Sequence, residues 1–257
     1  MRDVGLSNGD KKFLNFHCPH LNFGIVMKKL WCLALTGIVL LSLFSMLTFY
    51  AFASEEPANL MVVEWYGNGH VVLNQIPPGD DSMTNPDYKL LPFWWQTTIH
   101  YWVNPKNKYD FSEDAVISAI TAAAETWDQE TNFELFVYMG TTTRSAGKRD
   151  GYNVVAWGSY VSGQAIAVTY IWYKGDSIIE TDTIMNTRFK WSLTGEAGKM
   201  DVQNIMTHEF GHWCGLDDLY EDKDYWLTMY GYASYGETYK RTLGLGDIFG
   251  LQERYGK

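Results

Sequence analysis

The chain has 257 residues, of which 46% are hydrophobic, 16% aromatic and 19% charged, and its formal net charge is −10. A chain of this composition can bury a sizeable core, which excludes a mainly disordered protein. The acidic excess lies beyond residue 53, because the first 53 residues hold five of the 20 Lys and Arg but only two of the 30 Asp and Glu. A surface this acidic repels phosphate, so we expect no nucleic-acid partner.

Residues 27–53 have the three-part pattern of a secretory signal peptide. Met27-Lys28-Lys29 is the positive start, an uncharged apolar stretch follows from Leu30, and Ala51-Phe52-Ala53 supplies the small residues that precede a cleavage site. The apolar stretch is also long enough to span a bilayer, so an uncleaved signal-anchor stays open as the alternative. Both interpretations place residues 54–257 outside the cytoplasm, either secreted or anchored to the membrane, because the lysine pair stays inside.

Residues 1–26 precede this pattern and do not belong to it. We interpret them as an N-terminal tail that begins at a start site assigned too early, with Met27 as the real first residue. Two of the three cysteines, Cys18 and Cys32, fall in the tail and the signal, so only Cys214 lies in the rest of the chain. No intrachain disulfide is therefore expected there, and a domain of about 200 residues can be stable through its core alone.

Residues 54–92 form a short segment rich in Pro, Gly, Asn and Asp. Within it, Met61–Tyr66 and His70–Asn74 flank Gly67-Asn68-Gly69, a pattern that predicts a small hairpin. The pattern becomes regular at about residue 93, so we expect one domain over residues 93–257.

The domain is predicted to begin with a strand and a helix. Thr97–Val103 has the composition of a strand, and Asn104-Pro105 ends it. Ser112 is a suitable N-cap for a helix over Glu113–Gln129, whose apolar residues recur at helical spacing.

Four more strands and two more helices follow. The strands are predicted at Phe133–Met139, Asn153–Trp157, Ala165–Tyr173 and Ser177–Met185. The helices are predicted from Met200 to about Cys214 and over Leu245–Tyr255. Five strands and three helices in this order predict an α+β or mixed α/β domain.

The second helix carries the motif His208-Glu209-Phe210-Gly211-His212. Two histidines four residues apart lie on one face of a helix, about 40° apart in rotation, so both imidazoles can reach one metal ion. Zinc accepts such nitrogen ligands. Glu209 is offset by about 100° from His208, beside the metal, where it can take a proton from a zinc-bound water.

The residues after this motif extend it. Gly215 can take a positive φ, which ends the helix and turns the chain back toward the metal. Asp218, three residues further on, can then supply a carboxylate as the third ligand. The neighbouring Asp217 stays open as an alternative ligand, although the spacing favours Asp218. Three ligands leave a fourth position for water or substrate, as in catalytic zinc sites.

The motif resembles that of the metzincin metalloproteases, which ends in a third histidine and is followed by a turn that contains a methionine. Asp218 replaces that histidine, as in the snapalysin-like peptidases and some prokaryotic matrixin-like proteins. The candidate for the Met-turn is Thr228-Met229-Tyr230-Gly231, and its Met-Tyr pair is similar to the matrixin version. The resemblance spans roughly residues 93–257.

This resemblance implies a metzincin-like catalytic domain with a five-stranded, twisted, mixed sheet, three helices and a Met-turn. The edge strand of such a sheet binds the substrate backbone as an added strand. By position that strand is Ala165–Tyr173, with Ala165 and Ala167 as substrate-binding residues. Tyr230, Gly231 and Tyr232 are expected to wall the pocket for the side chain that follows the scissile bond.

The resemblance also implies a zinc cofactor held by His208, His212 and Asp218. A structural calcium ion is a further expectation, at Glu221–Asp224 together with Asp217, with a solvated acidic loop as the alternative. The cysteine-containing propeptide motif of animal matrixins is absent, but residues 54–92 are long enough to lie across the cleft as a short plug.

The function expected from these observations is a secreted or surface-anchored zinc endopeptidase, with Glu209 as general base and a protein or peptide as substrate. A membrane is expected as a partner only through an uncleaved N-terminal anchor. The alternative from another class is an inactive extracellular binding protein on the metzincin fold.

Overall fold

The structure, a computed structural model, describes residues 57–67, 79–162 and 164–257. The tail, the signal and the expected strand His70–Asn74 lie outside these residues. In the described part, no helix has the length and apolar character needed to cross a membrane. Residues 57–257 form one unit, so the described residues of the segment 54–92 pack together with the domain that follows.

The main sheet has seven strands in the order β3-β2-β4-β6-β5-β1-β9. The strands are β1 (Asn59–Gly67), β2 (Ile99–Asn104), β3 (Phe136–Thr141), β4 (Asn153–Gly158), β5 (Ala165–Lys174), β6 (Ser177–Asn186) and β9 (Tyr232–Ala233). Strands β3, β2, β4 and β6 are mutually parallel, whereas β5 is antiparallel to β6. The mixed α+β class is therefore as expected, and β2 to β6 correspond to the five predicted strands.

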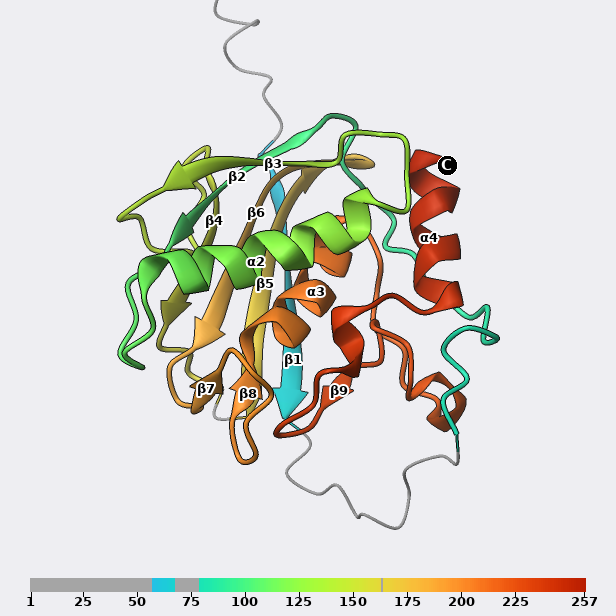
Figure 1. Cartoon of the computed structure of the whole chain (residues 1–257). Helices are drawn as coiled ribbons and strands as arrows, with labels where there is room; N and C mark the ends of the chain where they lie inside the picture. Colours follow the sequence, from blue (N-terminus) through green and yellow to red (C-terminus); the bar gives the residue numbers. More distant parts are fainter. Residues whose placement is uncertain (1–56, 68–78, 163) are drawn as a thin grey trace, which may run out of the picture. The chain divides into compact units, whose positions relative to one another are not determined.

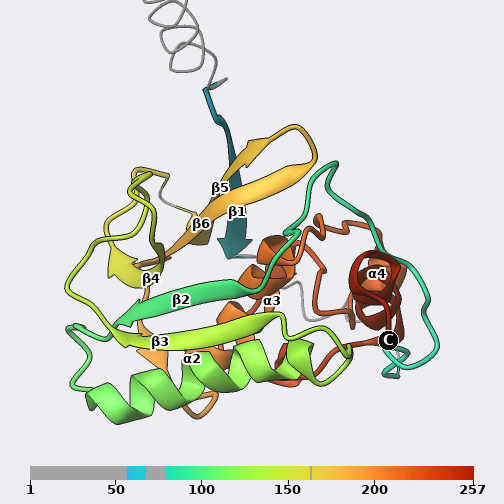
Figure 2. The same ribbon diagram turned by 90° about the horizontal axis from the view of Figure 1, so that it is seen from above.

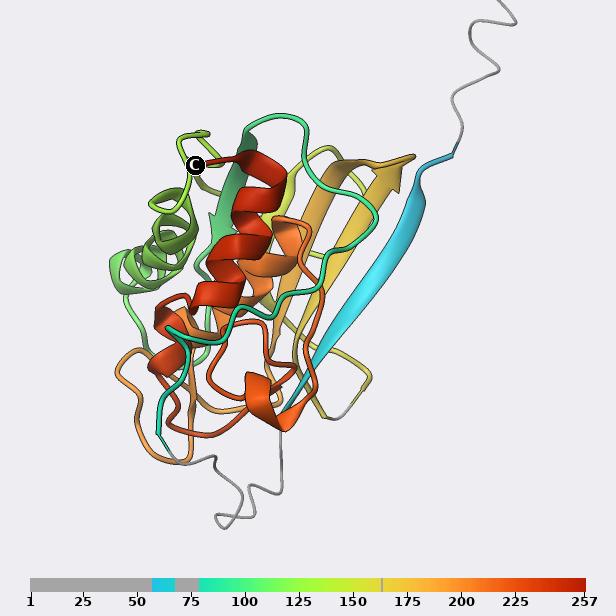
Figure 3. The ribbon, with the colours of Figure 1, turned by 90° about the vertical axis from the view of Figure 1, so that its right-hand side faces the viewer.

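Two additions make the sheet larger than the expected five strands. Strand β1 pairs antiparallel with the outer side of β5, and β9 pairs parallel with the end of β1. The expectation that Ala165–Tyr173 is the free edge strand is therefore wrong for this chain. The expected hairpin partner of Met61–Tyr66 lies outside the described residues, and β1 finds its partner in β5 instead. Figure 3 shows β1, in cyan, running alongside β5.

The long helix α2 (Glu113–Asp128) lies across one face of the sheet next to α3 (Val202–Trp213), as Figures 1 and 2 show. The first turn of α2 is capped by Ser112, whose side chain accepts a hydrogen bond from the Ala115 N–H. The two helices are joined by Trp127, whose Nε1 donates to the Thr207 carbonyl at 2.8 Å. The core therefore lies between these two helices and the sheet.

Helix α3 begins two residues later than predicted, because Asp201 is its N-cap and accepts from the Asn204 N–H. The preceding Met200–Asp201 forms strand β8, which pairs with β7 (Trp191–Ser192) in a small second sheet. Helix α4 covers Leu245–Tyr255, as predicted. The remaining helical elements are the short 3₁₀ helices η1 (Asp222–Asp224) and η2 (Tyr239–Arg241).

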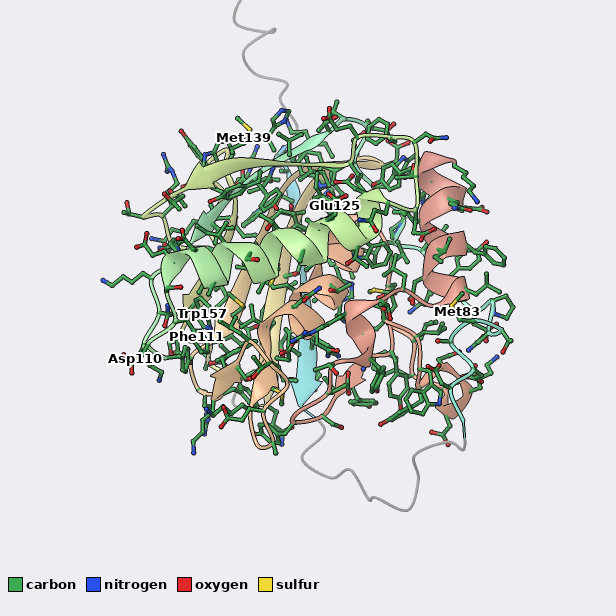
Figure 4. The ribbon with its side chains drawn as sticks, viewed as in Figure 1. Met83, Asp110, Phe111, Glu125, Met139 and Trp157 are labelled. Atoms are coloured by element: carbon green, nitrogen blue, oxygen red, sulfur yellow. The ribbon has the colours of Figure 1, made fainter. Side chains whose placement is uncertain are left out.

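Aromatic side chains extend the core toward the start of α2. Phe111 and Trp157 lie next to each other there in Figure 4, with their ring centroids 6.4 Å apart. Trp157 also makes an edge contact with the buried Trp191 of β7. These contacts fix the loop before α2 against the far end of the sheet, away from α4.

Candidate metal site and catalytic centre

Helix α3 places His208 and His212 one turn apart with their Nε2 atoms 3.1 Å from each other. The Nδ1 atom of His208 lies 2.7 Å from the Thr228 carbonyl, and the Nδ1 atom of His212 lies 2.9 Å from the Leu216 carbonyl. A carbonyl only accepts hydrogen bonds, so each Nδ1 carries the proton. Burial lowers the pKa of His208 to about 4, so its ring is neutral at neutral pH and Nε2 presents a lone pair.

Gly215 turns the chain after α3 so that Asp218 reaches the same point. Its φ is +87°, and a Cβ atom at this position would lie only 2.8 Å from the Phe93 carbonyl oxygen. The chain then runs beside the Met-turn, where Leu219 N–H donates to the Met229 carbonyl at 2.9 Å. This pairing holds Asp218 beside the two histidines.

The three side chains converge on one position. Asp218 Oδ1 lies 3.1 Å from His208 Nε2 and 3.7 Å from His212 Nε2, and it is buried without a hydrogen-bond donor. A tetrahedral zinc ion with bonds of about 2.0–2.1 Å holds its ligands about 3.3–3.4 Å apart. Three lone pairs at these separations repel each other unless a cation lies between them, so the donor set fits zinc.

The two acidic candidates for the third ligand differ in position. Asp218 faces the histidines, and its other oxygen accepts from the Tyr220 hydroxyl at 3.0 Å. Asp217 points elsewhere and forms a salt bridge of 2.6 Å with the largely exposed Lys89. The geometry therefore places Asp218, and not Asp217, with His208 and His212.

The segment around Met229 supports α3 from one side. Met229 is buried, and its side chain lies so close to Gly211 of α3 that a Cβ atom there would overlap it. Asp247 of α4 holds this turn in place, because its carboxylate accepts from the N–H groups of Thr228 and Met229 at 2.8 and 3.0 Å. The Thr228 carbonyl in turn orients His208, so the turn connects α4 to the histidine pair.

Glu209 lies beside the histidines at the end of a chain of buried hydrogen bonds. Trp213 Nε1 donates to the Thr183 hydroxyl at 2.9 Å, the Thr183 and Thr169 hydroxyls are 2.7 Å apart, and Thr169 donates to Glu209 Oε2 at 2.5 Å. A carboxylate only accepts, so Thr169 gives its proton to Glu209 and Thr183 gives its own to Thr169. Glu209 Oε1 is left buried without a partner.

The protonation chemistry of Glu209 suits a general base. Burial raises the pKa of this carboxyl to about 7, because the charged form is disfavoured away from water. A base with a pKa near neutrality can accept a proton and release it again in the same reaction cycle. The free Oε1 atom is the one available for this transfer.

Three of the five expected substrate-binding residues pair with β1. Ala167 pairs with Trp65 and Ala165 pairs with Tyr66, while Tyr66 also pairs with Tyr232 on its other side. The other two expected residues, Tyr230 and Gly231, lie just before β9. A Cβ atom at Gly231 would lie 2.8 Å from Tyr220 Cζ, so this glycine allows the Tyr220 ring to pack beside Asp218.

The sequence did not predict three residues that lie near the site: Trp65, Thr169 and Lys240. Trp65 stacks on the His208 ring with a centroid distance of 3.8 Å and an interplanar angle of 4°. Lys240 is buried, with its Nζ atom 5.4 Å from the Trp65 ring. None of the three belongs to a recognisable motif, and each lies far from the histidine motif in the sequence.

The expected calcium site has no support in the geometry. Lys223 pairs with Glu221 and Asp87, and Asp217 pairs with Lys89, so two of the expected ligands, Glu221 and Asp217, face a lysine. Within residues 57–67, 79–162 and 164–257, the one cluster able to hold a metal ion is His208, His212 and Asp218.

A mixed sheet, three helices and a cluster of two histidines on α3 with Asp218 after it fit the catalytic domain of a zinc metallopeptidase. The family model of the matrixins matches residues 93–256, more than half of the chain, so the chain belongs to the matrixin family. A comparison with curated proteins finds no significant match.

Proposed function

We propose that this matrixin is a zinc-dependent endopeptidase in which Glu209 is the general base and His208, His212 and Asp218 hold the metal. The observation that carries the proposal is the convergence of three lone pairs beside a carboxylate oxygen that has no partner. Zinc bound there supplies Lewis acidity toward water and toward the carbonyl of a peptide bond.

The residues of the chain supply the remaining steps. Glu209 takes a proton from the attacking water at Oε1, while Thr169 holds Oε2 in place. The same carboxyl then donates that proton to the nitrogen of the departing amine. The carbonyls of Thr228 and Leu216 keep both imidazoles in the tautomer that presents Nε2 to the metal.

We place this activity outside the cytoplasm, either secreted or anchored to the membrane. The support is the signal pattern over residues 27–53, with the lysine pair before a long apolar stretch. The natural substrate is a protein or peptide.

The experiment compares the full chain with its Glu209→Gln variant on a quenched-fluorescent casein, with equal zinc content. The variant keeps the size and burial of the side chain but loses the base, so its turnover is expected to fall by roughly 10²–10⁴-fold. Chelation is expected to abolish the activity of the wild type. Equal turnover by the two proteins would overturn the role of Glu209, and zinc binding without turnover in any form of the chain would favour the non-catalytic binding protein.

A further inference from the structure

Strand β1 occupies the edge of the sheet where an extended peptide would bind. It pairs antiparallel with β5 from Asn59 opposite Tyr173 to Tyr66 opposite Ala165, and its end pairs parallel with β9. Extended peptides bind sheet edges by adding a strand in this manner. The chain thus fills its own peptide-binding edge, as Figure 3 shows for β1 beside β5.

Trp65 packs beside the candidate metal ligands. Its side chain is fully buried, with one ring face stacked on His208 at 3.8 Å. Lys240 Nζ lies 5.4 Å from the ring and donates to Glu237 Oε1 and to the Tyr232 carbonyl, both at 2.7 Å. An imidazole face and a nearby ammonium group both favour an aromatic side chain.

Strand β1 packs against the core through only one of its two faces. Val63 and Trp65 face the core, whereas Leu60 and Val62 on the other face are 50% and 39% exposed. The Nε1 atom of Trp65 is buried without an acceptor among the described residues, so it adds no hydrogen bond to hold the strand. Release of β1 therefore uncovers one face of the edge and leaves the core between α2, α3 and the rest of the sheet in place.

Trp65 of β1 covers one face of the His208 ring in a candidate catalytic centre that is closed to solvent. His208, Glu209 and His212 are 0% exposed and Asp218 is 3% exposed. We propose that the pocket between His208, Lys240 and β9 binds a large aromatic side chain of an extended peptide, and that Trp65 occupies this pocket in the intact chain and keeps the peptidase latent. This inference rests on the proposed function for its consequence, but the occupancy of the pocket is tested separately from catalysis.

The test measures peptide binding in the Glu209→Gln background, where cleavage is expected to be slow enough to leave the peptide intact during the measurement. The probe is a fluorescein-labelled peptide with the sequence of residues 59–67, and its Kd is measured by fluorescence anisotropy on the full chain loaded with zinc. Adding Trp65→Ala empties the pocket, so the Kd is expected to fall by at least about tenfold, because the binding-competent fraction rises. Adding Val62→Ala, on the exposed face of the same strand, is the matched control and is expected to leave the Kd unchanged.

A second peptide, with Ala in place of its Trp, tests the pocket itself. It is expected to bind the Trp65→Ala chain at least about tenfold more weakly than the first peptide, because the stacking on His208 is lost. Equal affinity for the two peptides, or equal peptide binding with and without Trp65→Ala in chains of the same melting temperature, would overturn the proposal.

Hydrogen exchange tests the displacement of β1 even if Trp65→Ala does not fold. Excess peptide is expected to speed the exchange of the β1 amides in the Glu209→Gln chain while those of α3 stay protected. Unchanged exchange of β1 would show that it is a permanent strand. With Glu209 intact, Trp65→Ala is expected to raise casein turnover at least about tenfold. If Trp65→Ala binds the peptide more tightly but shows no turnover, the proposed pocket is supported and the proposed peptidase activity is contradicted.

Discussion

The Thr169 hydroxyl controls which oxygen of Glu209 is free. It donates to Oε2 at 2.5 Å, and it is itself oriented by Thr183 and Trp213 through hydrogen bonds that run in one direction. All four side chains are fully buried, so water cannot replace a missing donor easily. Thr169 therefore positions the carboxylate that we propose as the general base.

Replacing Thr169 tests this role. Thr169→Val keeps the shape of the side chain but removes the donor, so kcat is expected to fall by roughly 10–100-fold with little change in KM, because the carboxylate loses its orientation. Thr169→Ser keeps the hydroxyl and is expected to retain most of the wild-type kcat. Both constants are measured on a fluorogenic peptide at equal zinc content. A serine variant as impaired as the valine variant would show that the methyl packing matters and the hydrogen bond does not.

The residues of the motif and the residues around it differ in how they could be predicted. His208, Glu209 and His212 follow from helical spacing, and Asp218 follows from the glycine turn. Trp65 and Thr169 lie 143 and 39 positions before His208 in the chain, on strands whose pairing no local pattern specifies. Their contacts with the site arise only when β1 and β5 pair beside α3.

At the scale of elements, α3 packs closely against α2 and the Met229 turn. Gly211 allows this approach, because a Cβ atom there would overlap the Met229 side chain and lie 2.8 Å from Trp127 Cζ2. The sulfur of Met229 thus lies directly beneath the helix that carries both histidines. A glycine in the middle of a helix costs conformational free energy, which the close packing offsets here.

Gly211→Ala is expected to destabilise the fold despite the better helix propensity of alanine. The added methyl group overpacks the contact with Met229 and Trp127, so the free energy of unfolding is expected to fall by about 1–3 kcal/mol. Urea denaturation monitored by circular dichroism measures the change. Ser118→Ala, on the exposed face of α2, is the control and is expected to stay within about 0.5 kcal/mol of the wild type. A Gly211→Ala variant more stable than the wild type would contradict this account of the packing.

Most of the element predictions rest on local signals that the structure retains. Helix α4 has the predicted bounds, and α2 begins where Ser112 caps it. Strand β3 begins three residues later than predicted, because Asp128 accepts from the N–H groups of Leu135 and Phe136 and holds the chain in a turn. The additional strands β1 and β9 depend on partners distant in sequence, which periodicity does not identify.

At the scale of the whole molecule, zinc would add a further link between parts of the chain that already meet through packing and hydrogen bonds. Its expected ligands come from α3 and from the segment after Gly215, and that segment is paired with the Met229 turn, which α4 supports. A ligand that binds only the folded state stabilises the fold, by about 2.7 kcal/mol when its free concentration is 100 times its Kd.

Zinc removal is therefore expected to lower the melting temperature of the full chain by roughly 5–10 °C, measured by differential scanning calorimetry. Asp217→Asn, which loses only a salt bridge to Lys89, is expected to keep this response to zinc. Asp218→Asn, which loses the carboxylate beside the histidines, is expected to lose most of it. The opposite pattern would make Asp217 the ligand, and equal melting temperatures with and without zinc in the wild type would contradict a metal site built into the fold.

The sequence by itself determined the class of the domain, the helix that carries the histidine pair and the spacing of the candidate ligands. These features depend on helical periodicity, on caps and on a glycine turn, which act between residues close together in the chain. The tertiary structure decided that Asp218 faces the histidines while Asp217 faces Lys89, that Thr169 holds Glu209, and that β1 places Trp65 on His208. These contacts depend on the pairing of strands and the packing of helices across long stretches of sequence, where the buried neighbours of a side chain are chosen by the whole fold.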